Sequence, residues 1–286
     1  MPNVSEGRDE IRIRSLHREI TDSGARVLDV HSDADHHRTV FTVWGAGPRI
    51  ETAMSRLAIA AATIIDLEAH SGAHPRVGCL DVCPFVPLND NLGPAVAAAR
   101  RTAEAIGVGG LPVYLYGAAA LRAQTRELPV LRRGGLTALI ARAESGLVPD
   151  FGPRVISRSS GIVCVGARGP LIAFNAWLRC DLREARAIAA VVRETSGGLP
   201  GVRALGLVLA RSGMSQVSMN LTKPAVTGID DAFETVAAEA RRRNIAVTST
   251  EIVGLVPARF MPDPTREAAR LLMKPGRSLE SLLGAN

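Results

Sequence analysis

Residues 202–222 read VRALGLVLARSGMSQVSMNLT, and this stretch decides the fold that we predict. Two largely apolar segments, Val202–Arg211 and Gln216–Thr222, are joined by the turn-forming Ser212 and Gly213, which predicts a β-hairpin. A strand and a helix are predicted before the hairpin, and a helix and a strand after it: Leu171–Arg179, Leu182–Thr195, Asp230–Arg243 and Ile245–Ile252. The order strand, helix, strand, strand, helix, strand is the ferredoxin-like order, in which two helices cover one face of a four-stranded sheet.

The first half of the chain repeats this order. The predicted elements are strand Asn3–Ser5, helix Asp9–Thr21, strands Arg26–His31 and Arg38–Trp44, helix Glu51–Ala69 and strand Arg76–Phe85. Residues Gly93–Gly161 exceed the repeat, and they contain a helix to Ile106, a strand Pro112–Tyr116 and a helix Leu136–Glu144. We therefore predict an α+β protein of two ferredoxin-like subdomains, residues 1–168 and 169–286, with the extra segment on the first.

A row of polar side chains lies on the second strand of the predicted hairpin. Gln216, Ser218 and Asn220 face one way, because successive side chains of a strand point to opposite faces. If the two sheets face each other across a ligand cleft, Gln216 and Asn220 supply hydrogen-bonding groups to that ligand. A face in contact with solvent explains the row equally well.

Composition narrows the classes of function. Apolar residues make up 47% of the chain, yet no stretch reaches the ~20 apolar residues that cross a bilayer, and no signal-peptide pattern begins the sequence. We therefore expect a cytoplasmic protein with no membrane partner. The net charge of +6 suits polyanions, but aromatic residues are only 3% and offer few surfaces for stacking bases, so we expect no nucleic-acid partner. The four cysteines lack paired zinc-ligand spacing, so we expect no metal.

All six histidines lie before residue 75, and five of them flank two stretches interrupted by Gly, Pro and Asp. These stretches are HSDADHHRTV at residues 31–40 and HSGAHPRVGCLDVCPF at residues 70–85. The ordinary histidine pKa of about 6.5 lets this side chain take up and return a proton near neutral pH. Histidines clustered on loops therefore indicate a site of acid/base chemistry.

Neither stretch predicts a metal site. Asp33 and Asp35 fit a polar turn better than a cation site, because Asp is common in turns and further carboxylates are few. His70 and His74 have metal-ligand spacing only if they lie on a helix, and the Gly and Pro around them favour a loop.

Several short stretches along the chain are, taken together, specific for one protein family. They are PNVSEG (2–7), HRTV (37–40), HSGAHPRVGCLDVCPFVP (70–87), PVYLYG (112–117), PDFGP (149–153), GARGPLIAFN (166–175), QVSMNL (216–221) and EIVGLVP (251–257). In this order they resemble the glutamate formimidoyltransferase (formiminotransferase) family, in its bacterial stand-alone type. The resemblance covers nearly the whole chain.

The resemblance implies a homodimer that transfers a formimino group from N-formimino-L-glutamate to N5 of tetrahydrofolate, its cosubstrate, in histidine degradation. The family's general acid/base histidine, the second of HxGxHPRxG, falls on His74. Arg38, Arg76 and Arg168 lie inside matched phrases and are candidates for pairing with substrate carboxylates, although a surface ion pair explains Arg168 equally well. The family's folate-binding segment falls on Gly152, Pro153, Arg154, Val155, Ile156, Ser157, Arg158, Ser159, Ser160 and Gly161.

Two positions depart from the family pattern. Animal members have an acidic residue that assists the histidine at the end of a DVD stretch, whereas this chain has His31 in DVHSDAD (29–35). An imidazole cannot orient His74 as a carboxylate does, so either a nearby aspartate replaces it or His31 acts at the site in another way. Ser160 stands where the animal folate segment has an aromatic residue, so stacking there is lost.

Three other functions stay open. A related folate-dependent formyl transfer to or from glutamate would present a trigonal carbon to the same base. A folate-binding protein without turnover would follow if the His31 change abolishes catalysis. Nucleic-acid binding by a ferredoxin-like sheet rests on charge alone. Because the sequence ends soon after the second subdomain, we also expect no cyclodeaminase partner domain and release of the formimino-folate.

Overall fold

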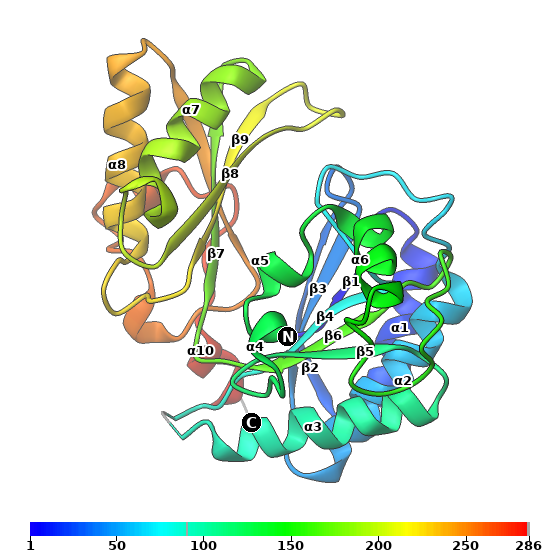
Figure 1. Cartoon of the computed structure of the whole chain (residues 1–286). Coiled ribbons are helices and arrows are strands. Elements are labelled where there is room, and N and C mark those ends of the chain that lie inside the picture. The colour runs from blue at the N-terminus through cyan, green and yellow to red at the C-terminus, as the bar shows by residue number, and fades with distance from the viewer. Residues whose placement is uncertain (90, 285–286) are drawn as a thin grey trace. The chain divides into compact units, whose positions relative to one another are not determined.

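The computed structural model describes residues 1–89 and 91–284 and divides into two units, which meet in sequence between Gly169 and Pro170. Both units contain helices and a sheet, which confirms the predicted α+β class (Figure 1). Unit 1 has six strands: β1 (Asn3–Val4), β2 (Arg26–Asp33), β3 (Arg38–Trp44), β4 (Leu80–Phe85), β5 (Val113–Gly117) and β6 (Val163–Ala167). Its helices are α1 (Glu10–Thr21), α2 (Pro48–Ile64), α3 (Gly93–Val108), α4 (Ala123–Arg126), α5 (Leu128–Leu131) and α6 (Gly135–Glu144).

The sheet of unit 1 has the strand order β2-β3-β1-β4-β6-β5. The first four strands are antiparallel to their neighbours, whereas β6 and β5 continue the sheet parallel to β4. The sheet has two strands more than the four of the ferredoxin-like order: β5, which lies in the extra segment Gly93–Gly161, and β6, which follows that segment. Val163–Ala167 escaped prediction because VCVGA is a short, continuously apolar run that carries no period-2 signal.

Both faces of this sheet are covered, but by different elements. One face packs against α1, α2 and α3, with Phe41, Leu57 and Val165 among the buried residues of that core. On the other face α5 and α6 pack over β4, β5 and β6, with Leu131 and Leu139 in the buried cluster. Over β1 and β3 this second face carries polar residues, including Asn3 and Arg38.

Unit 2 contains the elements that the hairpin stretch predicts. They are β7 (Ile172–Leu178), α7 (Leu182–Val192), β8 (Val202–Val208), β9 (Ser215–Leu221), α8 (Ile229–Arg242) and β10 (Val247–Val253), followed by the short α9 (Glu267–Arg270) and α10 (Leu279–Leu283). The antiparallel sheet has the order β10-β7-β9-β8. Val217, Met219 and Leu221 lie in the core with residues of α7 and α8, so Gln216, Ser218 and Asn220 lie on the other face of the sheet.

One difference in helix length matters for the site. The helix predicted over Glu51–Ala69 runs instead over Pro48–Ile64, because Pro48 occupies the first turn, where a proline is favoured, and Ile65 is extended. The strand predicted from Arg76 begins only at Leu80. Residues 65–79 therefore form one long loop that carries His70 and His74.

None of the helices among the described residues is long and apolar enough to cross a membrane.

Candidate active site

Two backbone segments bring the histidines together: the turn between β2 and β3, and the loop of residues 65–79. The Ala73 N–H donates to the carbonyl of Asp35 at 3.0 Å and joins the two segments. At Gly72 a Cβ would lie 2.5 Å from the carbonyl oxygen of His36, so only glycine permits this close approach. The segments line a small pocket formed by Ser5, His36, His37, Arg38, His74, Arg76 and Asp81.

The polar turn expected at Asp33 and Asp35 is confirmed. Residues 34–37 form the turn, and Asp33 Oδ1 accepts the His36 backbone N–H at 2.8 Å. His37 has φ 51°, a left-handed conformation, and closes the turn before β3 begins. The turn therefore directs His36 and His37 to the loop that carries His70 and His74.

His74 has a defined proton position. Its Nδ1 lies 2.7 Å from the Pro75 carbonyl oxygen, which can only accept, so Nδ1 carries the proton. Its Nε2 lies 2.5 Å from Nη1 of Arg38, which can only donate, so Nε2 holds the lone pair. The same Nη1 also lies 2.9 Å from Nδ1, so we assign the proton to Nδ1 because the Pro75 carbonyl can only accept and because the distance from Nη1 to Nε2 is the shorter one.

The surroundings of His74 disfavour its charged form. Burial lowers the pKa of His74 well below its ordinary value of 6.5, and the positive charges of Arg38 and Arg132 lower it further, followed by His36. The ring centroids of His36 and His74 are 5.9 Å apart. The lowered pKa favours a neutral imidazole in the free protein, with its Nε2 facing Arg38.

Arg38 reaches His74 from the start of β3. Its Nη2 donates to Oδ1 of Asn3, and its Nε is buried with no hydrogen-bond partner among the described residues. Burial lowers the pKa of Arg38 to about 10, while the Asp81 carboxylate acts in the opposite direction. Arg38 stays charged at neutral pH, and a buried cation with an unsatisfied donor suits a ligand carboxylate.

Arg76 lies in the same loop as His74. Its Nη2 donates to the carbonyls of Gly72 at 2.7 Å and of His74 at 2.9 Å. These bonds fix the shape of the loop and hold a second cation at the pocket.

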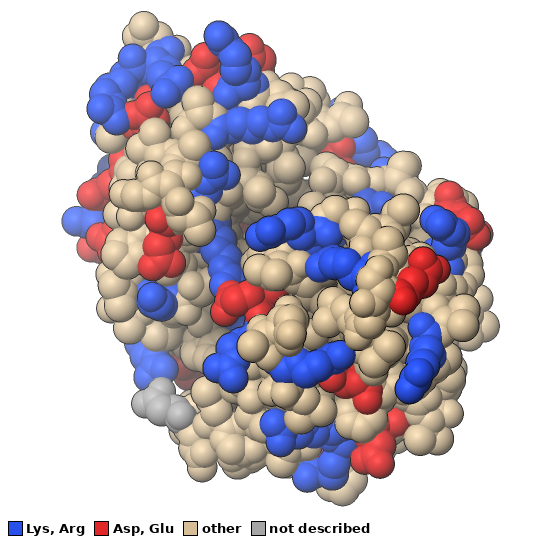
Figure 2. Space-filling view, viewed as in Figure 1, with Lys and Arg blue, Asp and Glu red and all other residues tan. Residues whose placement is uncertain are grey.

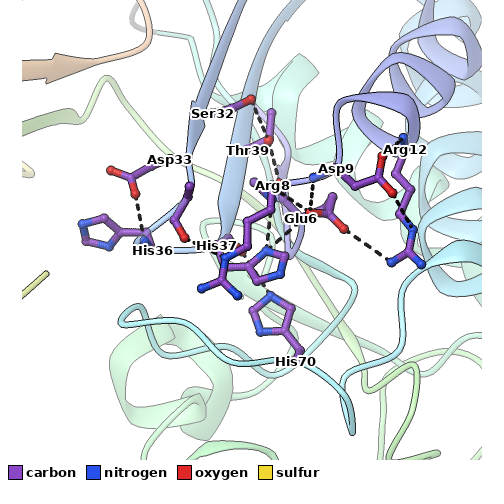
Figure 3. A network of polar contacts seen from close by, with 12 residues as sticks. Glu6, Arg8, Asp9, Arg12, Ser32, Asp33, His36, His37, Thr39 and His70 are labelled. Carbon is purple, nitrogen blue, oxygen red and sulfur yellow. Dashed lines mark hydrogen bonds and ion pairs between the residues drawn. The ribbon is translucent and has the colours of Figure 1, made fainter. Parts of the chain in front are cut away.

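A second histidine group lies beside this pocket (Figure 3). The rings of His37 and His70 are in contact, with centroids 4.0 Å apart and planes inclined by 32°, and His70 Nε2 donates to the His37 carbonyl at 3.1 Å. His37 Nδ1 accepts the Gly7 N–H at 3.1 Å and lies 3.5 Å from the buried Glu6 carboxylate. Burial lowers the pKa of His70 to about 4, aided by Arg76 and His37.

Glu6 anchors this second group. Its Oε1 accepts the backbone N–H groups of Arg8 at 2.8 Å and of Asp9 at 3.0 Å. Burial acts to raise the pKa of Glu6, but these backbone donors outweigh it and lower the pKa below its ordinary value. Glu6 is therefore a charged carboxylate that stabilises the start of α1 and its neighbour His37.

The sequence did not predict Asp81, which lines the pocket, or Arg132, which is the ion-pair partner of Asp81. Asp81 is 3% exposed and forms an ion pair of 2.6 Å with Arg132, which follows α5. Asp81 stands as the single charged residue of the apolar strand LDVCPF, and this was a usable signal of a buried polar partner. Arg132 lies in the extra segment, where nothing in the sequence marks it.

The predicted folate segment runs from an exposed end to a buried end. Gly152, Pro153, Arg154 and Val155 are exposed, and Ile156 is buried in the cluster under α6. Its second half is bound to both ends of the loop that carries His74: the Leu67 N–H donates to the Ser159 carbonyl at 2.8 Å, and the Cys79 N–H to the Ser160 carbonyl at 3.0 Å. Within this half, Ser157 and Arg158 are exposed, and Gly161 is buried against the Val77 carbonyl.

The other predicted residues lie outside this group. His31 is on β2, opposite Val40 and on the same face of the sheet as Arg38, but it does not line the pocket. Arg168 follows β6, and its N–H donates to the Phe85 carbonyl at the far end of β4 from the His74 loop. In unit 2, Gln216 is buried and Asn220 is exposed on the same face of β9. The roles given to these four residues stay predictions.

The described residues contain no group of three or more His, Cys, Asp or Glu side chains that could hold a metal ion. Cys79 and Cys83 are buried, and burial raises the pKa of each thiol to about 12. Both are therefore protonated thiols at neutral pH.

Comparison with known families agrees with the resemblance. The sequence model of the formiminotransferase domain, N-terminal subdomain, matches residues 1–168, and that of the formiminotransferase domain matches residues 173–273. The chain is 37% identical over 268 residues to the glutamate formimidoyltransferase of Streptococcus pyogenes serotype M1, covering 92% of this chain and 90% of the relative. It is 39% identical over 271 residues to that of Thermoplasma acidophilum, covering 92% and 89%.

A longer relative matches over the same part of the chain. The formimidoyltransferase-cyclodeaminase of Sus scrofa is 37% identical over 276 residues, which are 92% of this chain and 50% of the relative. The resemblance seen in the sequence is thus confirmed, and the chain belongs to the formiminotransferase family.

Proposed function

We propose that this protein is a transferase that moves a formimino group from N-formimino-L-glutamate to N5 of tetrahydrofolate, with His74 as general acid/base. Family membership and the glutamate formimidoyltransferases that it matches support the reaction. The observation that carries the proposal is the environment of His74: its Nδ1 lies 2.7 Å from the Pro75 carbonyl oxygen, its Nε2 lies 2.5 Å from Arg38, and its pKa is lowered by burial and by neighbouring cations.

One imidazole serves both proton transfers. When N5 of tetrahydrofolate forms a bond to the formimino carbon, it loses its proton to Nε2 of His74. When the tetrahedral adduct collapses, the bond from that carbon to the glutamate nitrogen breaks, and the imidazolium returns the proton to the leaving amine. His74 ends each cycle neutral, so the proton balance closes within the site.

The arginines have two effects in this proposal. Arg38 and Arg76 pair with the carboxylates of N-formimino-L-glutamate and hold its formimino carbon near His74. A carboxylate that neutralises Arg38 also removes a positive charge that lowers the pKa of His74. Substrate binding therefore raises the pKa of His74 towards the working pH and makes the ring a better base when the reactants are present.

The folate cosubstrate is assigned to the segment Gly152–Gly161. The hydrogen bonds from Leu67 and Cys79 to the Ser159 and Ser160 carbonyls support this assignment, because they tie the segment to the loop that carries His74. The proposal keeps His31 as a second catalytic residue, and it keeps Arg168, Gln216 and Asn220 as contacts for the cosubstrates, on the sequence patterns that predicted them.

The test is a transfer assay with purified protein, N-formimino-L-glutamate and tetrahydrofolate, followed by the absorbance of the formimino-folate. We expect turnover in the unmodified chain, and loss of turnover with folate binding retained in His74→Ala. His17→Ala, which changes a histidine on α1, is the matched control. Folate binding without turnover in the unmodified chain would favour a binding protein, and turnover only with 5-formyl-tetrahydrofolate and glutamate would favour formyl transfer.

Nucleic-acid binding gains no support from the face of the molecule drawn in Figure 2. On the face drawn in Figure 2, basic and acidic side chains are interspersed, whereas a nucleic-acid site needs a continuous basic stripe. Steeply salt-dependent binding to RNA would revive this function.

Finer proposals rest on the resemblance alone. We propose that the protein acts as a homodimer, in the cytoplasm, in the degradation of histidine. Sedimentation of the purified chain tests the dimer, and a single species at the mass of one chain would overturn it.

A further inference from the structure

Arg132 and Asp81 contact the His74 loop from two elements: Asp81 lies on β4, inside the phrase of residues 70–87, and Arg132 follows α5. We propose that Arg132 and Asp81 are positioning residues that act through the Pro75 carbonyl to hold the His74 proton on Nδ1. The expected loss of turnover rests on the proposed function, whereas the expected proton position does not.

The Asp81 carboxylate holds both ends of the segment that follows His74. Its Oδ1 accepts the Val77 N–H at 2.8 Å, and its Oδ2 accepts from Nη2 of Arg132 at 2.6 Å. The same Nη2 donates to the Pro75 carbonyl. Because Asp81 and Arg132 are 3% and 15% exposed, water competes little for these contacts.

The Pro75 carbonyl links the Asp81–Arg132 pair to the imidazole of His74. It accepts from His74 Nδ1 at 2.7 Å and from Arg132 at the same time. A carbonyl fixed at this distance accepts only a protonated Nδ1, so Nε2 keeps its lone pair on the side of Arg38. Asp81 thus orients the imidazole indirectly, through a guanidinium and a carbonyl, where other enzymes use a carboxylate in direct contact.

Arg132 also contributes to the positive charge around His74. The charged and titratable groups that face the ring are Arg38 from β3, Arg132 from the segment after α5 and His36 from the hairpin turn. Arg76 lies in the same loop and donates to the His74 carbonyl. Arg132 therefore affects which ring nitrogen of His74 carries the proton. It also lowers the pKa at which the ring takes up a second proton.

In this proposal the extra segment of unit 1 has a role at the site, because it supplies Arg132. Residues Gly93–Gly161 exceed the β-α-β-β-α-β core that both units share, and they supply α5, α6 and Arg132. In unit 1 this segment covers the second face of the sheet and delivers Arg132 to the loop that carries His74.

The experiment compares Arg132→Gln with Arg133→Gln, which removes the same charge from the exposed neighbouring position. NMR of the ring nitrogens in the substrate-free chain, with His74 assigned from the His74→Ala variant, reports its tautomer and titration. Transfer kinetics across pH give kcat and KM separately. Circular dichroism confirms folding, and Asp81→Asn replaces Arg132→Gln in every comparison if the latter does not fold.

In Arg132→Gln we expect a mixed His74 tautomer, a titration midpoint at higher pH than in Arg133→Gln, and kcat lower by about 10- to 100-fold through misplacement of the ring. Arg132→Lys should restore the tautomer and most of kcat, because a single nitrogen makes both contacts. A tautomer and midpoint equal to those of Arg133→Gln would overturn the proposal, and so would a lysine variant that behaves as the glutamine variant. If the unmodified chain transfers no formimino group, the proposed function fails, while the tautomer still decides this inference.

Discussion

Two histidine groups arise from the same hairpin turn and the same loop, yet their neighbours differ. The rings of His37 and His70 lie against each other beside the Glu6 carboxylate, and one nitrogen of each ring has a backbone partner. His74 lies among cations, with Arg38 on its basic nitrogen. The comparison teaches that the charge and hydrogen-bond partners around an imidazole, more than its place in a motif, separate a structural histidine from a reactive one.

The largest expected effect is on kcat, and it distinguishes His74 from the His37–His70 group. His74→Ala should lower kcat by roughly 10²- to 10⁴-fold, because it removes the only group assigned to both proton transfers. His70→Ala should leave kcat per folded molecule within about threefold of the unmodified chain. Steady-state transfer kinetics measure both values. Equal losses in the two variants would contradict the distinction.

Arg38→Gln should act mainly on substrate affinity. We expect KM for N-formimino-L-glutamate to rise about 10- to 100-fold, because a charge-assisted bond to a carboxylate is lost, while KM for tetrahydrofolate changes less. The same kinetics with each substrate varied in turn measure this. An unchanged KM for both substrates would remove Arg38 from the binding site.

Changes at the second histidine group, His37 and His70 with Glu6, should lower the stability of the fold rather than the activity. Glu6→Ala leaves two backbone N–H groups without their acceptor and removes the carboxylate beside His37, so we expect the free energy of unfolding to fall by about 2 kcal/mol. Urea denaturation measures this change, and Glu10→Ala on the exposed start of α1 is the control. A large loss of kcat in folded Glu6→Ala would show that the two groups are not separate.

The smallest effect concerns pH and His70. Its pKa falls from 6.5 in the unfolded chain to about 4 in the folded protein, so between these values the unfolded chain binds more protons. Stability from this group is therefore complete above pH 6.5 and is lost as the pH falls towards 4. Because the ring is partly exposed, we expect a discounted loss of about 1–2 kcal/mol. Thermal unfolding across this range should flatten in His70→Ala, and an unchanged curve would contradict the assignment.

The order of elements was accessible from the sequence because unit 2 has clear alternation and clear helical periodicity. The strand Val163–Ala167 and the short α5 were not, because short apolar runs fit several structures and gain their form from the sheet on which they pack. The loop of residues 65–79 was predicted too short, since the end of α2 is set by an extended Ile65.

The site was accessible only in part. The phrases around Arg38, Arg76 and His74 predicted residues that the structure brings to one pocket. The partner of the His74 Nδ1 proton was not predictable, because it is a backbone carbonyl, and every residue has one. Arg132 was equally hidden, since its contact with Pro75 depends on how the extra segment folds over the sheet.

The most direct test of the account is an NMR titration of the His74 ring in the substrate-free protein. At pH 6.5, where an ordinary histidine is half protonated, we predict a neutral ring with its proton on Nδ1, and a higher titration midpoint once N-formimino-L-glutamate is bound. A ring that titrates at or above pH 6.5 in the free protein, or that carries its proton on Nε2, would contradict the account.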